Sequence, residues 1–148
     1  MENRQVDLSW AGGYFEGEGS FCVCRRKNGK YYDTSIQASS VDFPLLEHLQ
    51  KIIGGSIYGS YKPSKSCQKS VWVWNVVSSK QIEITQELLP YLVIKKERAE
   101  LLIEARTIIN SRRGKHKGNQ YTKIIYDPYP IRLEEIYQRM KQLNKRGS

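Results

Sequence analysis

The sequence predicts an α+β domain with the element order αββαββα, in which a four-stranded antiparallel sheet carries helices on one face. Segments rich in β-branched and aromatic residues occur in pairs joined by turn signals, and each pair follows a segment with apolar residues at helical spacing. Strands joined by short turns pair antiparallel, and neighbouring helices then cover one face of the sheet. The 148 residues fit one domain, 1–148, with a core at about 5–110 and a basic loop and C-terminal helix at 111–148.

The first half of the chain contains two helix and two strand signals. A helix is expected over 7–16, capped by Asp7 or Ser9, and glycines at positive φ in the turn 17–20 should end it. Strands over 21–26 and 31–40 flank Asn28-Gly29, which is a strong hairpin signal. A second helix is expected over 44–53, with Asp42 as its N-cap and Gly54-Gly55 after its end.

The second half repeats the strand pair and then becomes helical. Strands are expected over 57–61 and 71–77, separated by a polar loop. Helices should follow over 79–89, 95–110 and 130–144, with a basic loop over 111–121.

The charge of the chain is positive and uneven. The net charge is +9, of which residues 1–94 carry +1 and residues 95–148 carry +8. This balance favours a polyanionic partner, with nucleic acid ahead of a membrane surface. Three cysteines without a zinc-ligand spacing indicate reduced thiols. No apolar run of about 18 residues and no signal peptide is present, so we expect an intracellular protein without a membrane partner.

The segment from Trp10 to Phe21 is the most unusual part of the chain. Gly12 and Gly13 are adjacent inside a predicted helix, which costs about 1 kcal/mol each relative to alanine. Small residues permit close approach of a second helix. Two such helices side by side would bring two Glu18 carboxylates together, and divalent cations between them would relieve the repulsion. The alternative is a glycine-rich helix end followed by an ordinary strand.

This segment resembles the LAGLIDADG motif of homing endonucleases, in the variant that ends Phe-Glu-Gly-Glu-Gly-Ser-Phe. The resemblance implies that Glu18 and the backbone carbonyl of Gly17 bind catalytic metal ions, Mg²⁺ or Mn²⁺. Glu16 matches the first acid of the motif, which is more often structural. Ala11 departs from the pattern, since the family usually has Leu or Ile there.

Two further segments extend the resemblance. Residues 89–99 are similar to the family's Leu-Pro-Tyr-Leu…Lys-x-x-x-Ala segment, which implies a catalytic role for Lys95 in the water network near the scissile phosphate. Ser40 stands where the family often has Gln, so the resemblance makes it a weaker catalytic candidate. Asp42 is expected to act as a helix cap.

A single motif copy implies a homodimer, because single-motif members of the family pair while double-motif members work as monomers. The expected dimer interface is formed by Ala11, Gly12, Gly13 and Phe15. The implied function is intron homing by metal-dependent hydrolysis of double-stranded DNA at a long pseudo-palindromic site, without a small-molecule cofactor. An archaeal cytoplasm, a chloroplast and a mitochondrion all fit as compartments.

The saddle-shaped sheet of this family would lie in the major groove of DNA. Alternation along the first strand places Phe21 and Val23 in the core. On strand four, Val71 and Val73 are assigned to the core and the tryptophans to DNA. The expected DNA contacts are Cys22, Cys24, Arg26, Asn28, Lys30, Gln37, Tyr61, Lys62, Lys65, Lys69, Trp72 and Trp74, with Arg112, Arg113, Lys115 and Lys117 on phosphates.

Three alternatives remain at this point. The same fold serves RNA-binding intron maturases and non-catalytic DNA-binding regulators, and a basic RNA-binding module unrelated to the family would also explain the charge. Glu18 and Lys95 favour the enzyme over pure binding.

Overall fold

The computed structural model describes residues 3–26, 31–61, 69–113 and 131–145. Six of the expected DNA contacts therefore lie outside the described residues: Asn28, Lys30, Lys62, Lys65, Lys115 and Lys117.

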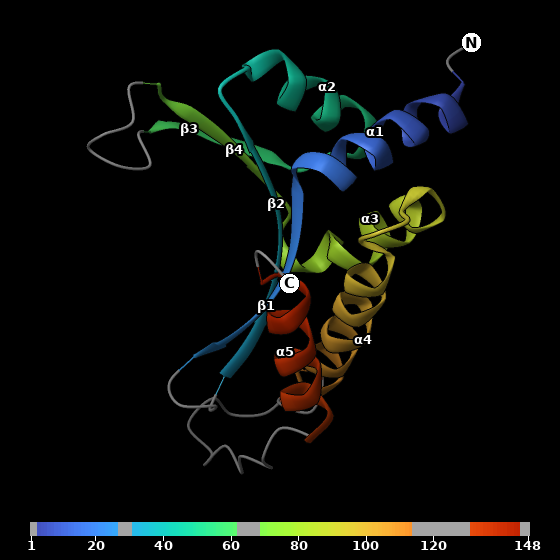
Figure 1. Ribbon diagram of the computed structural model, residues 1–148, viewed down its shortest axis with the longest axis vertical. Coiled ribbons are helices and arrows are strands. Elements are labelled where there is room, and N and C mark those ends of the chain that lie inside the picture. Colours follow the sequence, from blue (N-terminus) through green and yellow to red (C-terminus); the bar gives the residue numbers. More distant parts are fainter. Residues whose placement is uncertain (1–2, 27–30, 62–68, 114–130, 146–148) are drawn as a thin grey trace.

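In the described part of the chain, the sheet has four antiparallel strands in the order β1-β2-β4-β3. The strands are β1 (Gly19–Arg26), β2 (Tyr31–Ser40), β3 (Ser56–Tyr61) and β4 (Val71–Asn75). Figure 1 shows the two hairpins spreading apart towards their tips, while the helices lie on one face of the sheet. The predicted fold class and element order are confirmed.

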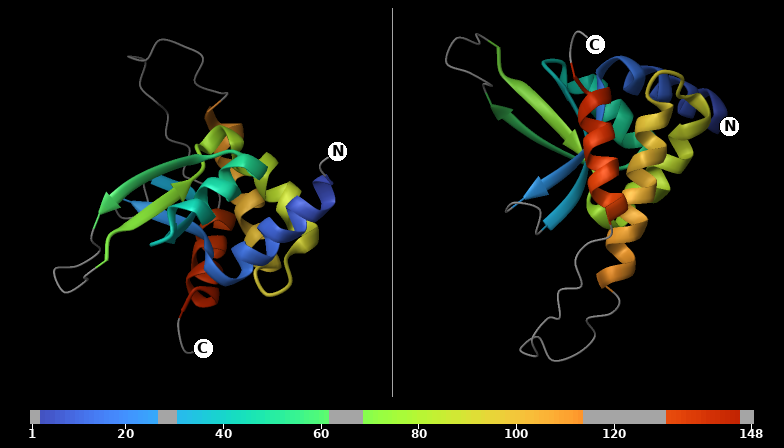
Figure 2. Two further views of the ribbon diagram at one scale, coloured as in Figure 1. Left: turned by 90° about the horizontal axis from the view of Figure 1, so that it is seen from above. Right: turned by 60° about the horizontal axis from the view of Figure 1, so that its bottom comes forward.

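The described residues also form five α-helices and two short 3-10 helices. They are α1 (Arg4–Glu18), α2 (Phe43–Ile53), η1 (Ser78–Lys80), α3 (Gln81–Leu88), η2 (Leu89–Tyr91), α4 (Lys96–Arg113) and α5 (Ile131–Leu143). In Figure 2, α4 and α5 lie side by side, and α5 also packs on β1. Within the same residues, no helix has the length and apolar character to cross a membrane.

Helix α1 is longer at both ends than the sequence predicts. Asn3 is its N-cap, in place of Asp7 or Ser9, and the Asn3 side chain accepts a hydrogen bond from the Gln5 amide at 3.1 Å. At the other end the helix continues through Glu18, and Gly19 is extended with φ −84° rather than left-handed. Gly19 is required for another reason, because a Cβ there would overlap the ring of Phe15.

Alternate residues of the strands form the core beneath the helices. Phe21, Ile36 and Trp74 are fully buried, and they meet Leu46, Leu102 and Leu133 from three helices. The predicted assignment of β1 is confirmed, since Phe21 and Val23 are buried while Cys22 and Cys24 are half-buried on the opposite face.

The prediction for strand four is wrong. Trp74 is fully buried and Trp72 packs against the ring of Phe43 at 4.9 Å, so the tryptophans face the helices and the valines face outward. The Trp74 indole N–H donates to the Gly54 carbonyl at 2.7 Å, which satisfies its polar group. Gly55 has φ +92° and lies against the indole, where a Cβ would collide. The bend at these glycines makes room for the large ring. Trp74 has no exposed surface left for DNA, and the half-buried Trp72 lies on the helix side of the sheet.

Asp42 occupies the N-cap position of α2 as predicted, but its side chain makes no capping hydrogen bond. The backbone amide of Asp42 donates to the Ser40 hydroxyl oxygen at 3.0 Å.

Candidate functional site

The carboxylate of Glu18 stands where the first helix meets the open face of the sheet. Glu18 is the last residue of α1 and is exposed, and β1 begins at the next residue. It borders two adjacent depressions, one lined by Ser20, Gln37 and Val73 and the other by Tyr14 and Ser40. The C-terminal end of a helix carries partial negative charge, so a carboxylate there is stabilised by a nearby cation.

Lys95 supplies one such cation. Its Nζ donates to the carbonyl of Phe15 at 3.0 Å and to the carbonyl of Gly19, both at the C-terminal end of α1. The Phe15 carbonyl also accepts a hydrogen bond from the Gly19 amide, and Gly19 is the first residue of β1, so Lys95 spans the junction of helix and strand. Burial lowers the pKa of Lys95, and the charge of Arg98 lowers it further, while Glu16 and Glu18 oppose the shift. An ammonium has three N–H donors, so one remains for a further partner.

Glu16 orders the same junction from the opposite direction. Its two carboxylate oxygens accept hydrogen bonds from the amides of Val93 (2.7 Å), Ile94 (3.1 Å) and Lys95 (3.1 Å). Burial by itself would raise the pKa of Glu16, but these three amides outweigh it and the pKa is lowered. Glu16 and Lys95 thus join α1 to the start of α4, which agrees with the structural role expected for the first acid.

Tyr14 belongs to this site and was not identified from the sequence. It lies one helical turn before Glu18 and lines the second depression together with Ser40. Burial raises the pKa of Tyr14, and the charge of Glu18 adds to the increase, so its phenol stays protonated at neutral pH. The four-residue spacing from Glu18 was the signal that could have found it.

Several of the predicted DNA contacts lie on the open face of the sheet or near its ends. Ser20 and Cys22 pair with Gln37 and Ser35 of β2, and Gln37 is exposed. Tyr61 ends β3, and Lys69 is exposed before β4. Arg112, which is half-buried, and Arg113 are the last residues of α4, which lies on the helix side of the sheet. Arg26 is exposed at the end of β1.

The predicted dimer-interface residues divide into two groups. Ala11, Gly12 and Phe15 are buried within their own chain, and a Cβ on Gly12 would lie 2.5 Å from the Cβ of Tyr91. Their assignment to a dimer interface is therefore wrong: the small size of Gly12 serves close packing of α1 on η2. Gly13 is exposed, and a Cβ there would meet nothing within 4 Å.

An apolar surface that the sequence analysis missed lies beside Glu16. Val93 and Ile94 are 82% and 75% exposed, although Glu16 holds both of their amides in place. Gly17, also exposed and open at its Cβ position, is the residue after Glu16. Large apolar side chains held in an ordered exposed turn are typical of an interaction surface.

The donor atoms present suit a hard divalent cation. Glu18 supplies a carboxylate, and Gly17 lies in the last turn of α1, where backbone carbonyls lack helical partners. Among the described residues, no group of three or more His, Cys, Asp or Glu side chains could hold a metal ion. Asp42 lines the second depression together with Glu18.

The fold and this junction define a class of protein: a two-layer α+β domain with an open antiparallel sheet and an acidic helix end at its middle. The family model described as LAGLIDADG endonuclease matches residues 11–96, more than half of the chain. The chain belongs to the LAGLIDADG endonuclease family.

Solved structures share the fold at low sequence identity. The archaeal intron-encoded homing endonuclease I-Vdi141I, complexed with DNA, is 16% identical with a TM-score of 0.68, covering 99% of this chain and 89% of that chain. The homing endonuclease I-CvuI, in complex with the I-CreI target in 2 mM Mg, is 16% identical with a TM-score of 0.59, covering 93% and 96%. I-GzeII, in complex with its DNA target, is 23% identical with a TM-score of 0.61, covering 87% and 42%. No curated protein sequence matches the chain.

Proposed function

We propose that this chain is a homodimeric, site-specific endonuclease that cleaves double-stranded DNA at a long, roughly two-fold-symmetric site, as in intron homing. The position of Glu18 carries the proposal. Its carboxylate is exposed at the end of α1, directly where the open sheet face begins. Family membership and structural neighbours in complex with DNA support this assignment.

Divalent metal ions, Mg²⁺ or Mn²⁺, fit the oxygen donors of Glu18 and Gly17. One neighbour was crystallised with Mg and, in another complex, with Ca. Such ions lower the pKa of water and stabilise the leaving oxygen of a phosphodiester. Because α1 ends in one Glu18 per chain, two paired chains would place two Glu18 carboxylates around the scissile phosphates.

The surrounding side chains position water and phosphate. The remaining N–H donor of Lys95 can hydrogen-bond a phosphate oxygen, and the bonds of the ammonium to the carbonyls of Phe15 and Gly19 hold it in place. The side chains of Ser40 and Tyr14 line the depression beside Glu18, and the Ser40 hydroxyl can hold water there. Ser40 therefore keeps part of the role for which the family often uses Gln.

Two sheets side by side would read the major groove over two half-sites. Base contacts are assigned to the open-face side chains Cys22, Cys24, Arg26 and Gln37, and phosphate contacts to Arg112 and Arg113. The surface of Gly13, Gly17, Val93 and Ile94 would bury itself against the second copy. Small residues on α1 allow the two helices to approach closely.

Selection from a randomised double-stranded DNA library tests the proposal. Cleavage in Mg²⁺ should recover ends that share a long, nearly palindromic consensus, with Ca²⁺ as the binding-only condition. Glu18→Gln should keep binding and lose cleavage by at least about a hundredfold, since the variant cannot hold the metal ions. Glu100→Gln, which alters an exposed carboxylate on α4, is the matched control and should cleave normally.

Binding without cleavage in either Mg²⁺ or Mn²⁺ would contradict the endonuclease and favour a non-catalytic DNA-binding protein. Preferential binding of structured intron RNA would favour a maturase, which shares the basic surface but does not require Glu18.

A further inference from the structure

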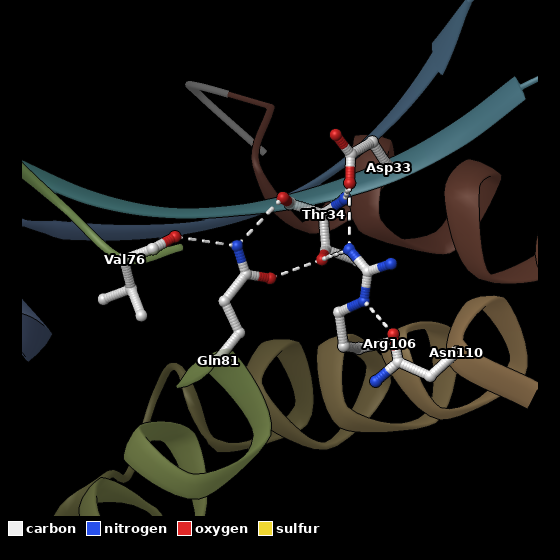
Figure 3. A network of polar contacts seen from close by, with 6 residues as sticks. All are labelled: Asp33, Thr34, Val76, Gln81, Arg106 and Asn110. Carbon is white, nitrogen blue, oxygen red and sulfur yellow. Dashed lines mark hydrogen bonds and ion pairs between the residues drawn. The ribbon is translucent and has the colours of Figure 1, made fainter. Parts of the chain in front are cut away.

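Along the first half of β2, one edge of the strand is occupied by side chains of helices α3 and α4 in place of a neighbouring strand. Strand β4 pairs with β2 only over Gln37–Ser40, so earlier residues of β2 have a strand neighbour only in β1 within the described residues. Gln81 of α3 occupies the open edge: its amide N–H₂ donates to the carbonyls of Thr34 (3.2 Å) and Val76 (3.0 Å), and Thr34 donates to its oxygen (Figure 3).

Arg106 of α4 reaches the same edge and is buried there. Its side chain has no exposed area, and its Nη1 donates to Asp33 Oδ1 at 2.9 Å and to the Thr34 hydroxyl at 3.2 Å. Its Nε donates to the side-chain oxygen of Asn110 at 3.1 Å. A buried cation is strongly destabilising without a counter-ion. Asp33 is therefore the residue that makes this buried arginine tolerable.

The carboxylate of Asp33 faces two environments. Oδ1 accepts from Arg106 and also from the Thr34 backbone amide at 2.9 Å. The side chain is nonetheless 47% exposed and belongs to the open-face series with Ser35 and Gln37. Figure 3 shows the second oxygen directed away from Arg106, and among the described residues no donor reaches it.

A carboxylate on a surface that meets DNA repels phosphates unless its charge is offset. The guanidinium of Arg106 offsets it from inside the protein without reaching the surface itself. The result is an outward oxygen in a fixed orientation that acts only as an acceptor. Guanine presents only acceptors in the major groove, and thymine presents an acceptor and a methyl group, so neither base can donate to this oxygen. Adenine has a donor amine, but an acceptor lies next to it. Cytosine presents its N4 amine without a competing acceptor.

We propose that Asp33 is a specificity-determining residue that accepts a hydrogen bond from the N4 amine of one cytosine in each half-site, and that Arg106 holds it in position. This inference rests on the proposed function. The proposed function assigns a DNA-binding surface, and this inference adds a base preference that one side chain sets.

The substitution Asp33→Asn gives the sharpest test. The Thr34 amide and Arg106 Nη1 both donate to the inner atom Oδ1, so in the variant only the amide oxygen can occupy that position. The N–H₂ group of the substituted side chain must then point outward. The outward group changes from acceptor to donor. The selected site should lose cytosine at one symmetric pair of positions and gain guanine or thymine there, with a preference change of about tenfold.

Selection in Ca²⁺ with full-length wild type, Asp33→Asn and a Glu83→Gln control separates the outcomes. Glu83 is exposed on α3, on the helix side of the sheet, and its variant should reproduce the wild-type consensus. If wild type selects no consensus, the proposed function fails. If wild type selects a consensus that Asp33→Asn leaves unchanged, Asp33 is only the counter-ion of Arg106 and the inference is overturned.

A second measurement uses wild-type protein alone, in case Asp33→Asn does not fold. N4-methylcytosine keeps its base pair but replaces the major-groove amine hydrogen with a methyl group. Substituting each cytosine of the consensus in turn should weaken binding about tenfold at one symmetric pair of positions. Equal binding to every substituted site would overturn the inference.

Discussion

At the scale of single residues, the two acids of the motif have opposite environments. Glu16 is tied to three backbone amides, while Glu18 is exposed at the sheet junction. Both are carboxylates two residues apart, and only their surroundings separate a structural group from a candidate catalytic group. The same holds for Lys95, whose ammonium is held at the end of α1 by two carbonyls and retains one further N–H donor.

The bonds of Glu16 predict a pH-dependent stability. Its pKa is lowered in the folded protein, so its contribution is present above the unfolded pKa and is lost as pH falls through the folded pKa. Glu16→Gln should lower the free energy of unfolding by about 1–3 kcal/mol at pH 7, with a smaller difference in acid. Denaturant unfolding at pH 7 and pH 3 measures this.

Glu100→Gln is the control for that experiment, because Glu100 is exposed and makes no hydrogen bond among the described residues. It should change stability by less than about 0.5 kcal/mol. A Glu16→Gln difference that is equally large at both pH values would show that the carboxylate charge is not what stabilises the junction.

At the scale of elements, α1 has two adjacent glycines with different neighbours. Gly12 packs against Tyr91 of η2, while Gly13 faces open space. Gly12→Ala should destabilise the monomer by about 1–3 kcal/mol because the added methyl group collides with Tyr91. Gly13→Ala should leave it equal or up to about 1 kcal/mol more stable, because alanine favours a helix.

Thermal unfolding of the two variants at low protein concentration measures that contrast. Equal destabilisation by both substitutions would contradict the packing of α1 on η2. The pair also bears on assembly, since Gly13→Ala can weaken the dimer only through a contact with a second copy.

At the scale of the whole molecule, the exposed turn after η2 predicts how two copies meet. Ile94→Asp should shift the dimer towards monomer, because a carboxylate replaces a side chain that the partner would bury. Sedimentation with and without DNA measures the shift. Ile131→Asp is the matched control, since Ile131 is 79% exposed at the start of α5 and should leave the dimer intact. Dissociation by both variants, or by neither, would contradict an interface at Ile94.

The sequence by itself determined the fold class and the order of strands and helices along the chain. It also identified Glu16, Glu18 and Lys95, which lie where α1 meets the sheet. These follow from local patterns: alternation in β1, helical spacing in α2 and α4, glycine and asparagine at turns, and a motif contiguous in the chain. The outward position of Gln37 also follows, because β2 alternates regularly between its two faces.

Only the tertiary structure decided the face of β4, the neighbours of Gly12 and the pairing of Asp33 with Arg106. On β4 both faces carry apolar residues, so alternation cannot select one; the space beside Gly54 and Gly55 selects the tryptophans. Asp33 and Arg106 are 73 residues apart, and no local pattern brings them together. Such contacts depend on where the sheet curves and how the helices cover it, which is set by packing across the whole chain.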